Sequence, residues 1–181
     1  MIKKVVLSAL AVLTVVLLIL VFAVAMQPNE FQVTRSAVID ASPDKVFEHV
    51  NDFQKWQAWS PWEKMDPNMQ RTYAGPPAGA GASYTWKGND EVGEGKMTIA
   101  ESDPGQRIKI DLDFVKPFES KNVTEFTFKP EGDKTAVSWT MTGRKDFVTK
   151  AVCMVMDMDK MIGNDFEKGL TQLRSAVETA Q

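Results

Sequence analysis

The sequence contains almost no cysteine or histidine. Its 181 residues include one of each, Cys153 and His49. One cysteine excludes an internal disulfide framework. One cysteine with one histidine also excludes the common zinc sites, which need four such ligands or three plus a carboxylate. A catalytic Ser/His or Cys/His pair would have to use His49. We therefore expect no metal site and no cofactor.

The sequence also has no excess of positive charge. It carries 21 Lys and Arg against 24 Asp and Glu, a formal net charge of −3. Binding to nucleic acid depends on clustered Lys and Arg that neutralise phosphates. The charge balance therefore predicts that nucleic acid is not a partner.

A long apolar run is present at the N-terminus. Residues 5–25 are uncharged and are interrupted only by Ser8 and Thr14. As a helix this run is about 31 Å long, which matches the hydrocarbon core of a bilayer. Lys3 and Lys4 precede it, and the next basic residue is Arg35. The positive-inside rule then predicts a cytoplasmic N-terminus with the rest of the chain outside, in the periplasm if the source is bacterial.

A cleaved signal peptide is the alternative interpretation of this run. Ala23-Val24-Ala25 matches an A-x-A cleavage site. However, the apolar core of a signal peptide is about 7–15 residues long, and this run is longer. We therefore expect a single-pass membrane anchor over residues 1–26, a linker over 27–30 and one domain over 31–181.

The remaining residues alternate between strand and helix patterns. A strand is predicted over 31–39, with Arg35 as the one charged residue on its apolar face, and Pro43 begins a helix. A second short helix follows. About six short strands joined by turns come next, the clearest over 108–114, where apolar and polar residues alternate. Apolar residues at helical spacing then predict one amphipathic helix of about 30 residues, capped by Asp146 and containing Gly163.

Several groups of residues occur together in an order typical of one superfamily. They are Ala41-Ser42-Pro43 with Val46-Phe47, Trp56 with Trp59-Ser60-Pro61-Trp62 and Asp66-Pro67, Gly75 to Gly81 with Tyr84-Thr85-Trp86, Gly88-Asn89, Gly93-Glu94-Gly95 with Met97, and Met161, Gly163 and Asp165 to Leu170. Over residues 31–179 the chain resembles the START-like superfamily, also called the polyketide cyclase/dehydrase and lipid-transport (SRPBCC) superfamily, and in particular its membrane-anchored bacterial members.

The resemblance implies an α+β fold of the helix-grip type, in which an antiparallel sheet curls around a long C-terminal helix. It also implies an apolar cavity between sheet and helix that holds a hydrophobic small molecule or lipid. The residues that we expect to line this cavity are the inward-facing side chains of the sheet and the terminal helix. They are Trp86, Met97, Ile110, Leu112, Phe114, Phe128, Trp139, Met141, Met154, Met158, Met161 and Ile162.

Each of these residues also has a simpler interpretation as part of a filled core. In favour of a pocket, five of the ten methionines lie from Met141 to Met161, and methionine adapts to varied apolar ligands. Trp56, Trp59 and Trp62 are expected to lock the short helices onto the sheet, with a membrane contact or a flap over the pocket as the alternative. We expect His49 at the surface and Cys153 to be buried and inert.

Three functions are consistent with these features. The first is a membrane-tethered, non-catalytic domain that binds a hydrophobic or amphipathic molecule. The second is an interaction module with a filled core, whose protein partner the sequence does not identify. The third is a cyclase- or hydrolase-type enzyme with acidic residues, Tyr84 or His49 as acid and base, which would require polar groups with perturbed pKa values inside the pocket.

Overall fold

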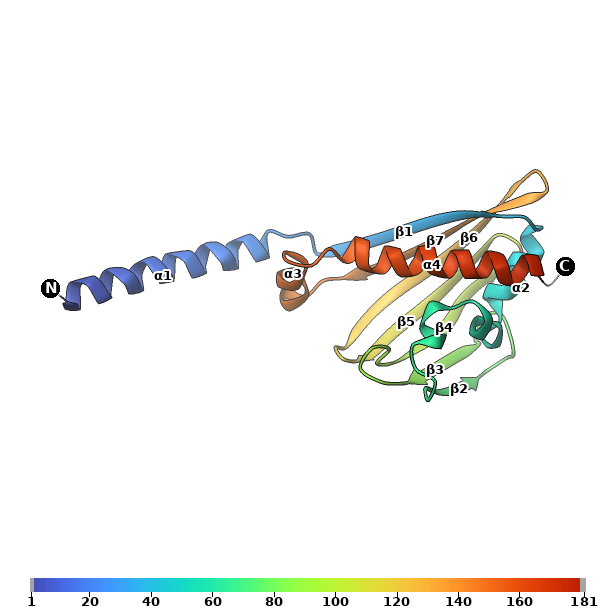
Figure 1. Ribbon diagram of the computed structural model, residues 1–181, viewed down its shortest axis with the longest axis horizontal. Helices are drawn as coiled ribbons and strands as arrows, with labels where there is room; N and C mark the ends of the chain where they lie inside the picture. Colours follow the sequence, from blue (N-terminus) through green and yellow to red (C-terminus); the bar gives the residue numbers. More distant parts are fainter. Residues whose placement is uncertain (1, 180–181) are drawn as a thin grey trace. The chain divides into compact units, whose positions relative to one another are not determined.

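The computed structural model describes residues 2–179 and contains one seven-stranded sheet with helices before, between and after its strands (Figure 1). The elements in chain order are α1 (Ile2–Ala25), β1 (Glu30–Ile39), α2 (Pro43–Asn51), the 3₁₀ helices η1 (Phe53–Ala58) and η2 (Pro61–Lys64), β2 (Gln70–Ala74), β3 (Ser83–Lys87), β4 (Glu94–Asp103), β5 (Arg107–Lys116), β6 (Ser120–Glu131), β7 (Lys134–Arg144), α3 (Phe147–Cys153) and α4 (Met158–Thr179).

The sheet is an antiparallel meander in the order β1-β7-β6-β5-β4-β3-β2. Strands β2 to β6 each pair with the next strand in the chain, and β1 closes the far edge beside β7. Short turns are enough to connect consecutive strands in this topology, because antiparallel neighbours need no crossover connection. The predicted α+β helix-grip architecture, with a sheet and a long C-terminal helix, is confirmed.

The chain divides into two compact units. The first unit contains residues up to Phe31 together with Lys145–Asp157, and so holds α1 and α3. The second contains Gln32–Arg144 and the residues from Met158 onwards, and so holds most of the sheet together with α4. Residues 145–157 thus group with the N-terminal helix in this division.

The expected single helix from Asp146 onwards is wrong, because the structure has two helices there. Asp146 is the predicted N-cap, and its carboxylate accepts the Thr149 N–H at 2.7 Å. The helix ends at Cys153, because the N–H groups of Met154 and Val155 bond three residues back and tighten the last turn. Helix α4 then begins afresh at Met158. The apolar spacing continues through the break, so periodicity could not reveal it.

The core of the second unit lies between the sheet and the helices that cover one of its faces. Helix α4 runs across this face beside α2 and the 3₁₀ helices (Figure 1). The largest side chains with almost no exposed surface come from both layers. They are Trp59, Trp139, Phe126, Phe166, Ile39, Ile99, Ile108, Ile110, Leu170, Leu173, Val33 and Val46.

Candidate functional site

The interior of the second unit is not packed evenly along its length. On β5, Ile108 and Ile110 are 0% exposed, Leu112 is 8% exposed and Phe114 is only half-buried. Helix α4 shows the same gradient from its C-terminal end to its N-terminal end. There Leu173 and Leu170 are buried and Ile162 and Met158 are partly exposed. Met161 is 50% exposed and lies about 140° around the helix from Phe166, at the margin of the apolar face. The layers therefore meet tightly at one end and loosen towards the other.

The tight end is filled by an aromatic cluster, which we call the aromatic block (Trp56, Trp59, Trp62, Phe126, Trp139 and Phe166). Phe166 of α4 stacks on Trp139 of β7 with ring centroids 4.0 Å apart and an interplanar angle of 7°. Phe126 stacks on the same indole at 4.7 Å. Trp59 and Trp62 contact Trp139 edge-on at 5.7 and 5.8 Å. The predicted role of the three tryptophans in packing the short helices is confirmed.

Gly169 permits this close packing of α4 on the aromatic block. A Cβ atom at this position would lie 2.8 Å from the Trp139 ring and 3.2 Å from Pro61. Any larger residue would push the helix away from the sheet, because real Cβ atoms do not approach other atoms so closely. The Gly169 and Pro61 motifs are therefore explained by helix-to-sheet contact.

At the less buried end the sheet carries apolar side chains on β3, β4 and β5, and the first turns of α4 carry further apolar side chains. Trp86 pairs across β3 and β4 with Gly95, and Gly95 pairs with Phe114 on β5. A Cβ atom on Gly95 would lie 2.5 Å from the Trp86 ring, so the indole rests directly on the glycine backbone. The Trp86 and Phe114 rings meet edge-on at 5.7 Å. We call this region the open end (Trp86, Met97, Leu112, Phe114, Met158, Met161 and Ile162).

The indole N–H groups of the sheet tryptophans already have partners within the protein. Trp86 donates to the carbonyl of Val92 at 3.0 Å, and Trp139 donates to Thr124 Oγ1 at 2.8 Å. These tryptophans therefore present apolar ring surface and no free donor to a ligand. Asp165, one helical turn beyond Met161 and Ile162, is a polar group that sequence reasoning did not single out. Burial raises its pKa, and the nearby Lys168 partly offsets this effect.

The twelve residues expected to line a cavity separate into three groups. The eight on strands all lie on the inward face of the sheet: seven are buried, and Phe114 is half-buried. Met158, Met161 and Ile162 lie in the first turns of α4. Met154 is the exception, because the helix break places it at the end of α3, in the first unit, where it is exposed. It therefore does not come from the same helix as the other three.

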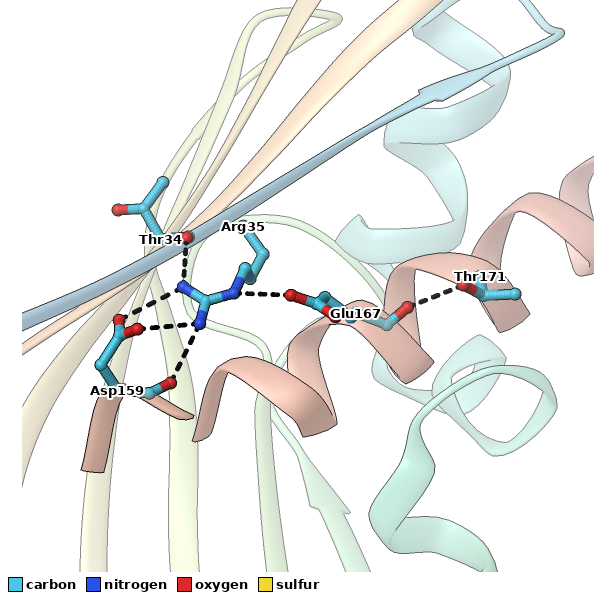
Figure 2. Close-up of polar contacts among 5 residues, drawn as sticks. All are labelled: Thr34, Arg35, Asp159, Glu167 and Thr171. Carbon is cyan, nitrogen blue, oxygen red and sulfur yellow. Dashed lines mark hydrogen bonds and ion pairs between the residues drawn. The ribbon is translucent and has the colours of Figure 1, made fainter. Parts of the chain in front are cut away.

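Arg35 anchors the N-terminal half of α4 to the edge strand β1 (Figure 2). Its guanidinium donates to both carboxylate oxygens of Asp159, at 2.9 and 3.2 Å, and to Glu167 at 2.9 Å. It also bonds the carbonyls of Thr34 and Asp159. A Cβ atom on Gly163 would lie 2.0 Å from Arg35 Nη2, so only glycine leaves room for this side chain. The charged side chain of Arg35, on the inward face of β1, thus holds the N-terminal half of α4 against this strand.

Loss of the Arg35 contact should be visible in the ionisation of Asp159. The hydrogen bond from Arg35 lowers the pKa of Asp159 below the ordinary aspartate value. Because the folded-state pKa is lowered, the contact stabilises the protein at neutral pH and is lost as the pH falls through that lowered value. We expect Arg35→Gln to return the Asp159 pKa towards its ordinary value and to speed amide exchange in the first turn of α4.

NMR titration and hydrogen exchange measure these two changes. Lys134→Gln is the matched control, because its carboxylate partner Asp40 lies 3.9 Å away and both side chains are mostly exposed. An unchanged Asp159 titration in Arg35→Gln would contradict the assigned contact.

A buried network of Glu63, Arg71 and Tyr84 lies between η2 and the strands β2 and β3. The carboxylate of Glu63 accepts hydrogen bonds from Arg71 Nε and from the Tyr84 hydroxyl, both at 2.6 Å. Its side chain is 5% exposed. Burial and the hydrogen bond to Glu63 raise the pKa of Tyr84, so the phenol stays protonated as a donor. Glu63 thus holds both Tyr84 and Arg71, an arrangement that ties η2 to strands β2 and β3.

Asp66 has a similar structural role. Its carboxylate is buried and accepts the backbone N–H groups of Asn68 and Asn89, each at 2.8 Å. A Cβ atom on Gly88 would lie 2.9 Å from Asp66 Oδ2. The Asp66-Pro67 and Gly88-Asn89 motifs therefore belong to one contact between the η2 loop and the β3–β4 turn.

A surface groove of about 690 Å³ lies between α4 and the helices α2, η1 and η2. Sequence reasoning did not predict it, because its walls come from segments far apart in the chain. Its lining residues are His49, Lys55, Ala58, Lys64, Thr171, Gln172, Ser175, Ala176 and Thr179. The hydroxyls of Thr171, Ser175 and Thr179 each donate to the carbonyl four residues earlier, so they are already engaged within the helix.

The single histidine and cysteine lie apart from the open end. His49 Nδ1 is 2.9 Å from the carbonyl of Lys45, and the imidazole borders the surface groove. Cys153 is partly exposed at the end of α3, rather than buried as expected. Within residues 2–179 no three His, Cys, Asp or Glu side chains come together as a metal site.

The sequence of residues 30–178 matches the family model described as polyketide cyclase/dehydrase and lipid transport. The chain belongs to this family. Its members bind hydrophobic small molecules, so the family supports a ligand-binding domain. None of the curated proteins compared with the chain matches it.

Solved structures of low sequence identity share the fold. Protein CV1439 from Chromobacterium violaceum is 19% identical with a TM-score of 0.57, and the match covers 83% of this chain and 99% of that one. Mll3558 from Rhizobium loti is 18% identical with a TM-score of 0.61, covering 81% and 96%. SA2116 from Staphylococcus aureus, a protein of unknown function, is 12% identical with a TM-score of 0.63, covering 83% and 95%. At these identities the likeness concerns the fold alone.

Proposed function

We propose that this family member is a membrane-tethered binding protein that holds a hydrophobic or amphipathic small molecule, lipid-like in character, at the open end. The observation that carries this proposal is the gradient of burial between the sheet and α4. An apolar layer that becomes progressively exposed on both facing elements leaves ligand-accessible surface where a filled core would leave none. The family binds hydrophobic small molecules generally, which supports a ligand of this kind.

The driving force for such binding is removal of apolar surface from water. A chain that buries 300 Å² would gain about 7 kcal/mol before the cost of ordering. The side chains at the open end are aromatic rings, methionines and aliphatic groups. Asp165 lies on the same part of α4, burial raises its pKa, and its carboxyl suits the polar end of an amphipathic molecule.

The tether is the second part of the proposal. Among residues 2–179 one helix, Lys3–Ala25, is long and apolar enough to cross a bilayer. Its length and composition suit either a signal sequence or a membrane span. The length of the apolar run and the two preceding lysines favour a span with the domain outside the cytoplasm.

Photo-crosslinking in a bilayer tests the proposal with the full-length chain. The protein is reconstituted in nanodiscs that contain a diazirine-labelled fatty acid, and cross-linked residues are mapped by mass spectrometry. We expect cross-links at Phe114 and Met161 in addition to those in α1. Cross-links confined to α1 would refute the binding site and leave the tether intact.

Two variants sharpen this test. Leu112→Trp fills the open end, and Met161→Asp places a charge at its margin without disturbing the aromatic block. We expect each to reduce cross-linking at Phe114 about tenfold, which corresponds to about 1.4 kcal/mol of binding free energy. Val38→Asp is the matched control, because Val38 is an exposed apolar residue on β1 that lies outside the open end.

A second candidate function is an interaction module with a filled core. The aromatic block favours it, because stacking of Phe166 on Trp139 leaves that end of the interior occupied by the protein's own rings. The same experiment separates the two candidates. A ligand-binding domain gives cross-links at Phe114 that disappear in Leu112→Trp, whereas a filled module gives none in either protein.

A further inference from the structure

The segment that connects β7 to α4 carries a dense group of exposed apolar side chains. Between Phe147 and Met156 the only charged residue is Lys150. Exposed large apolar side chains occur along the whole segment, and Val155 is 86% exposed. We call this group the α3 apolar surface (Phe147, Val148, Val152, Met154, Val155 and Met156). An apolar group of this size on a water-exposed surface normally marks an interaction site.

The structure connects this surface to the end of the apolar helix α1. Helix α3 lies beside the C-terminal end of α1, and both belong to the same compact unit (Figure 1). Lys150 Nζ donates to Asn29 Oδ1 at 2.5 Å and lies 3.5 Å from the carbonyl oxygen of Ala25, the last residue of α1. The backbone N–H of Lys145 also donates to the carbonyl of Asn29, at 2.7 Å.

Lys150 suits this position for a physical reason. The last carbonyls of a helix have no partners within the helix, and the helix dipole places partial negative charge there. A lysine ammonium satisfies these carbonyls, while its stem lies against apolar side chains. Lys150 is the one charged residue between Phe147 and Met156, and at 8% exposed it is also the one buried residue there. Its charge points towards the end of α1, and the apolar side chains around it remain exposed.

We propose that the α3 apolar surface lies in the interface of the lipid bilayer, between headgroups and acyl chains, at the point where α1 leaves the membrane. This inference rests on the proposed membrane span. If α1 crosses the bilayer, Ala25 lies at the boundary of the hydrocarbon core, and Lys150 holds α3 at the same level. Amphipathic segments at this depth bury their apolar side chains about 5–10 Å into the boundary region. The bilayer is thus the partner, and α3 fixes the orientation of the chain at the membrane surface.

Fluorescence quenching in vesicles tests the inference with the full-length protein. In a Cys153→Ala background, a single cysteine labelled with the environment-sensitive dye NBD is placed by Val148→Cys, Leu13→Cys or Val38→Cys. Each protein is reconstituted in phosphatidylcholine vesicles that contain lipids with a nitroxide quencher near the headgroup or near the chain end. Val38 is an exposed valine of the other compact unit and is the matched control.

We expect blue-shifted emission at position 148 with loss of fluorescence mainly to the shallow quencher. At position 13 we expect loss mainly to the deep quencher, and at position 38 aqueous emission with little loss. Adding Val155→Asp should shift the emission at position 148 towards its value in water, whereas Val38→Asp should not.

The possible failures can be distinguished. Quenching at position 13 with aqueous emission at position 148 overturns the interfacial role of α3 and leaves the membrane span intact. Aqueous emission at position 13 overturns both the span and the inference that rests on it. Equal quenching at positions 148 and 38 would show general adsorption to lipid and would also refute a specific role for the α3 surface.

Discussion

Replacing Phe166 with alanine is expected to lower the free energy of unfolding by about 3–5 kcal/mol, the usual cost of removing a buried aromatic ring. Phe166 is 2% exposed, and its ring stacks on Trp139 at a centroid distance of 4.0 Å. The substitution removes this stacking and leaves a cavity that the rigid aromatic block cannot close. Because Phe166 is the main aromatic contact from α4, the loss should also loosen the helix over the sheet.

Urea unfolding of the full-length protein in mild detergent, followed by tryptophan fluorescence, measures this change. Met161→Ala on the same helix is the matched control, since Met161 is half-exposed and its removal should cost less than about 1 kcal/mol. Similar losses in the two variants would mean that the burial gradient along α4 is wrong.

Replacing Glu63 with alanine is expected to cost about 3–5 kcal/mol as well, because removal of one partner leaves a largely buried charge uncompensated. Glu63 accepts from Arg71 and Tyr84, both at 2.6 Å. In Glu63→Ala the Arg71 guanidinium loses its carboxylate and the buried Tyr84 hydroxyl loses its acceptor. We expect the contact between η2 and strands β2 and β3 to open first.

The same unfolding measurement applies, with Glu48→Ala as the control. Glu48 pairs with Lys55 at 3.6 Å, and both side chains are well exposed, so its loss should cost about 0–1 kcal/mol. Glu63→Gln retains an acceptor for Tyr84, so its loss of unfolding free energy should lie between those of Glu63→Ala and Glu48→Ala. A Glu63→Ala protein as stable as Glu48→Ala would show that the buried network does not hold the 3₁₀ helices in place.

The aromatic block and the Glu63 network lie in the tightly packed part of the second unit, and the proposed ligand site lies at the open end. Phe166 and Glu63 maintain the fold, whereas Met161 is 50% exposed and can accept a change of polarity without loss of the fold. Met161→Asp is therefore a suitable probe of binding, and Phe166→Ala and Glu63→Ala are probes of stability. Leu112 is 8% exposed, so cross-linking of Leu112→Trp is compared together with its free energy of unfolding.

Several local features were predictable because they depend on neighbouring residues. Alternation over Ile108 to Phe114 placed the inward face of β5 correctly, since side chains alternate strictly across a strand. Asp146 was recognised as a helix cap because a carboxylate before a helix accepts its free N–H groups. The end of α3 at Cys153 was not predictable, because the apolar spacing continues into α4 and only the tightened turn at Met154 separates the helices.

Other features became intelligible only through contacts between distant segments. Arg35 was an exception to the apolar pattern of its strand. The structure explains it by an ion pair with Asp159, which lies far along the chain. Glycine is unfavourable inside a helix, and the structure explains Gly163 by the space that the Arg35 side chain occupies. Lys150 is an isolated charge in an apolar segment, and the structure explains it by the contact of its ammonium group with the last carbonyl of α1.

Periodicity, turn residues and the N-terminal apolar run by themselves determined the element types, the antiparallel meander and the α+β class, because these depend on the spacing of residues along the chain. The tertiary structure alone decided which part of the interior is filled, which charges anchor α4, and that residues 145–157 join the N-terminal helix. These properties depend on distances between side chains that are far apart in sequence, and a pattern of spacing contains no information about whether two distant surfaces meet tightly.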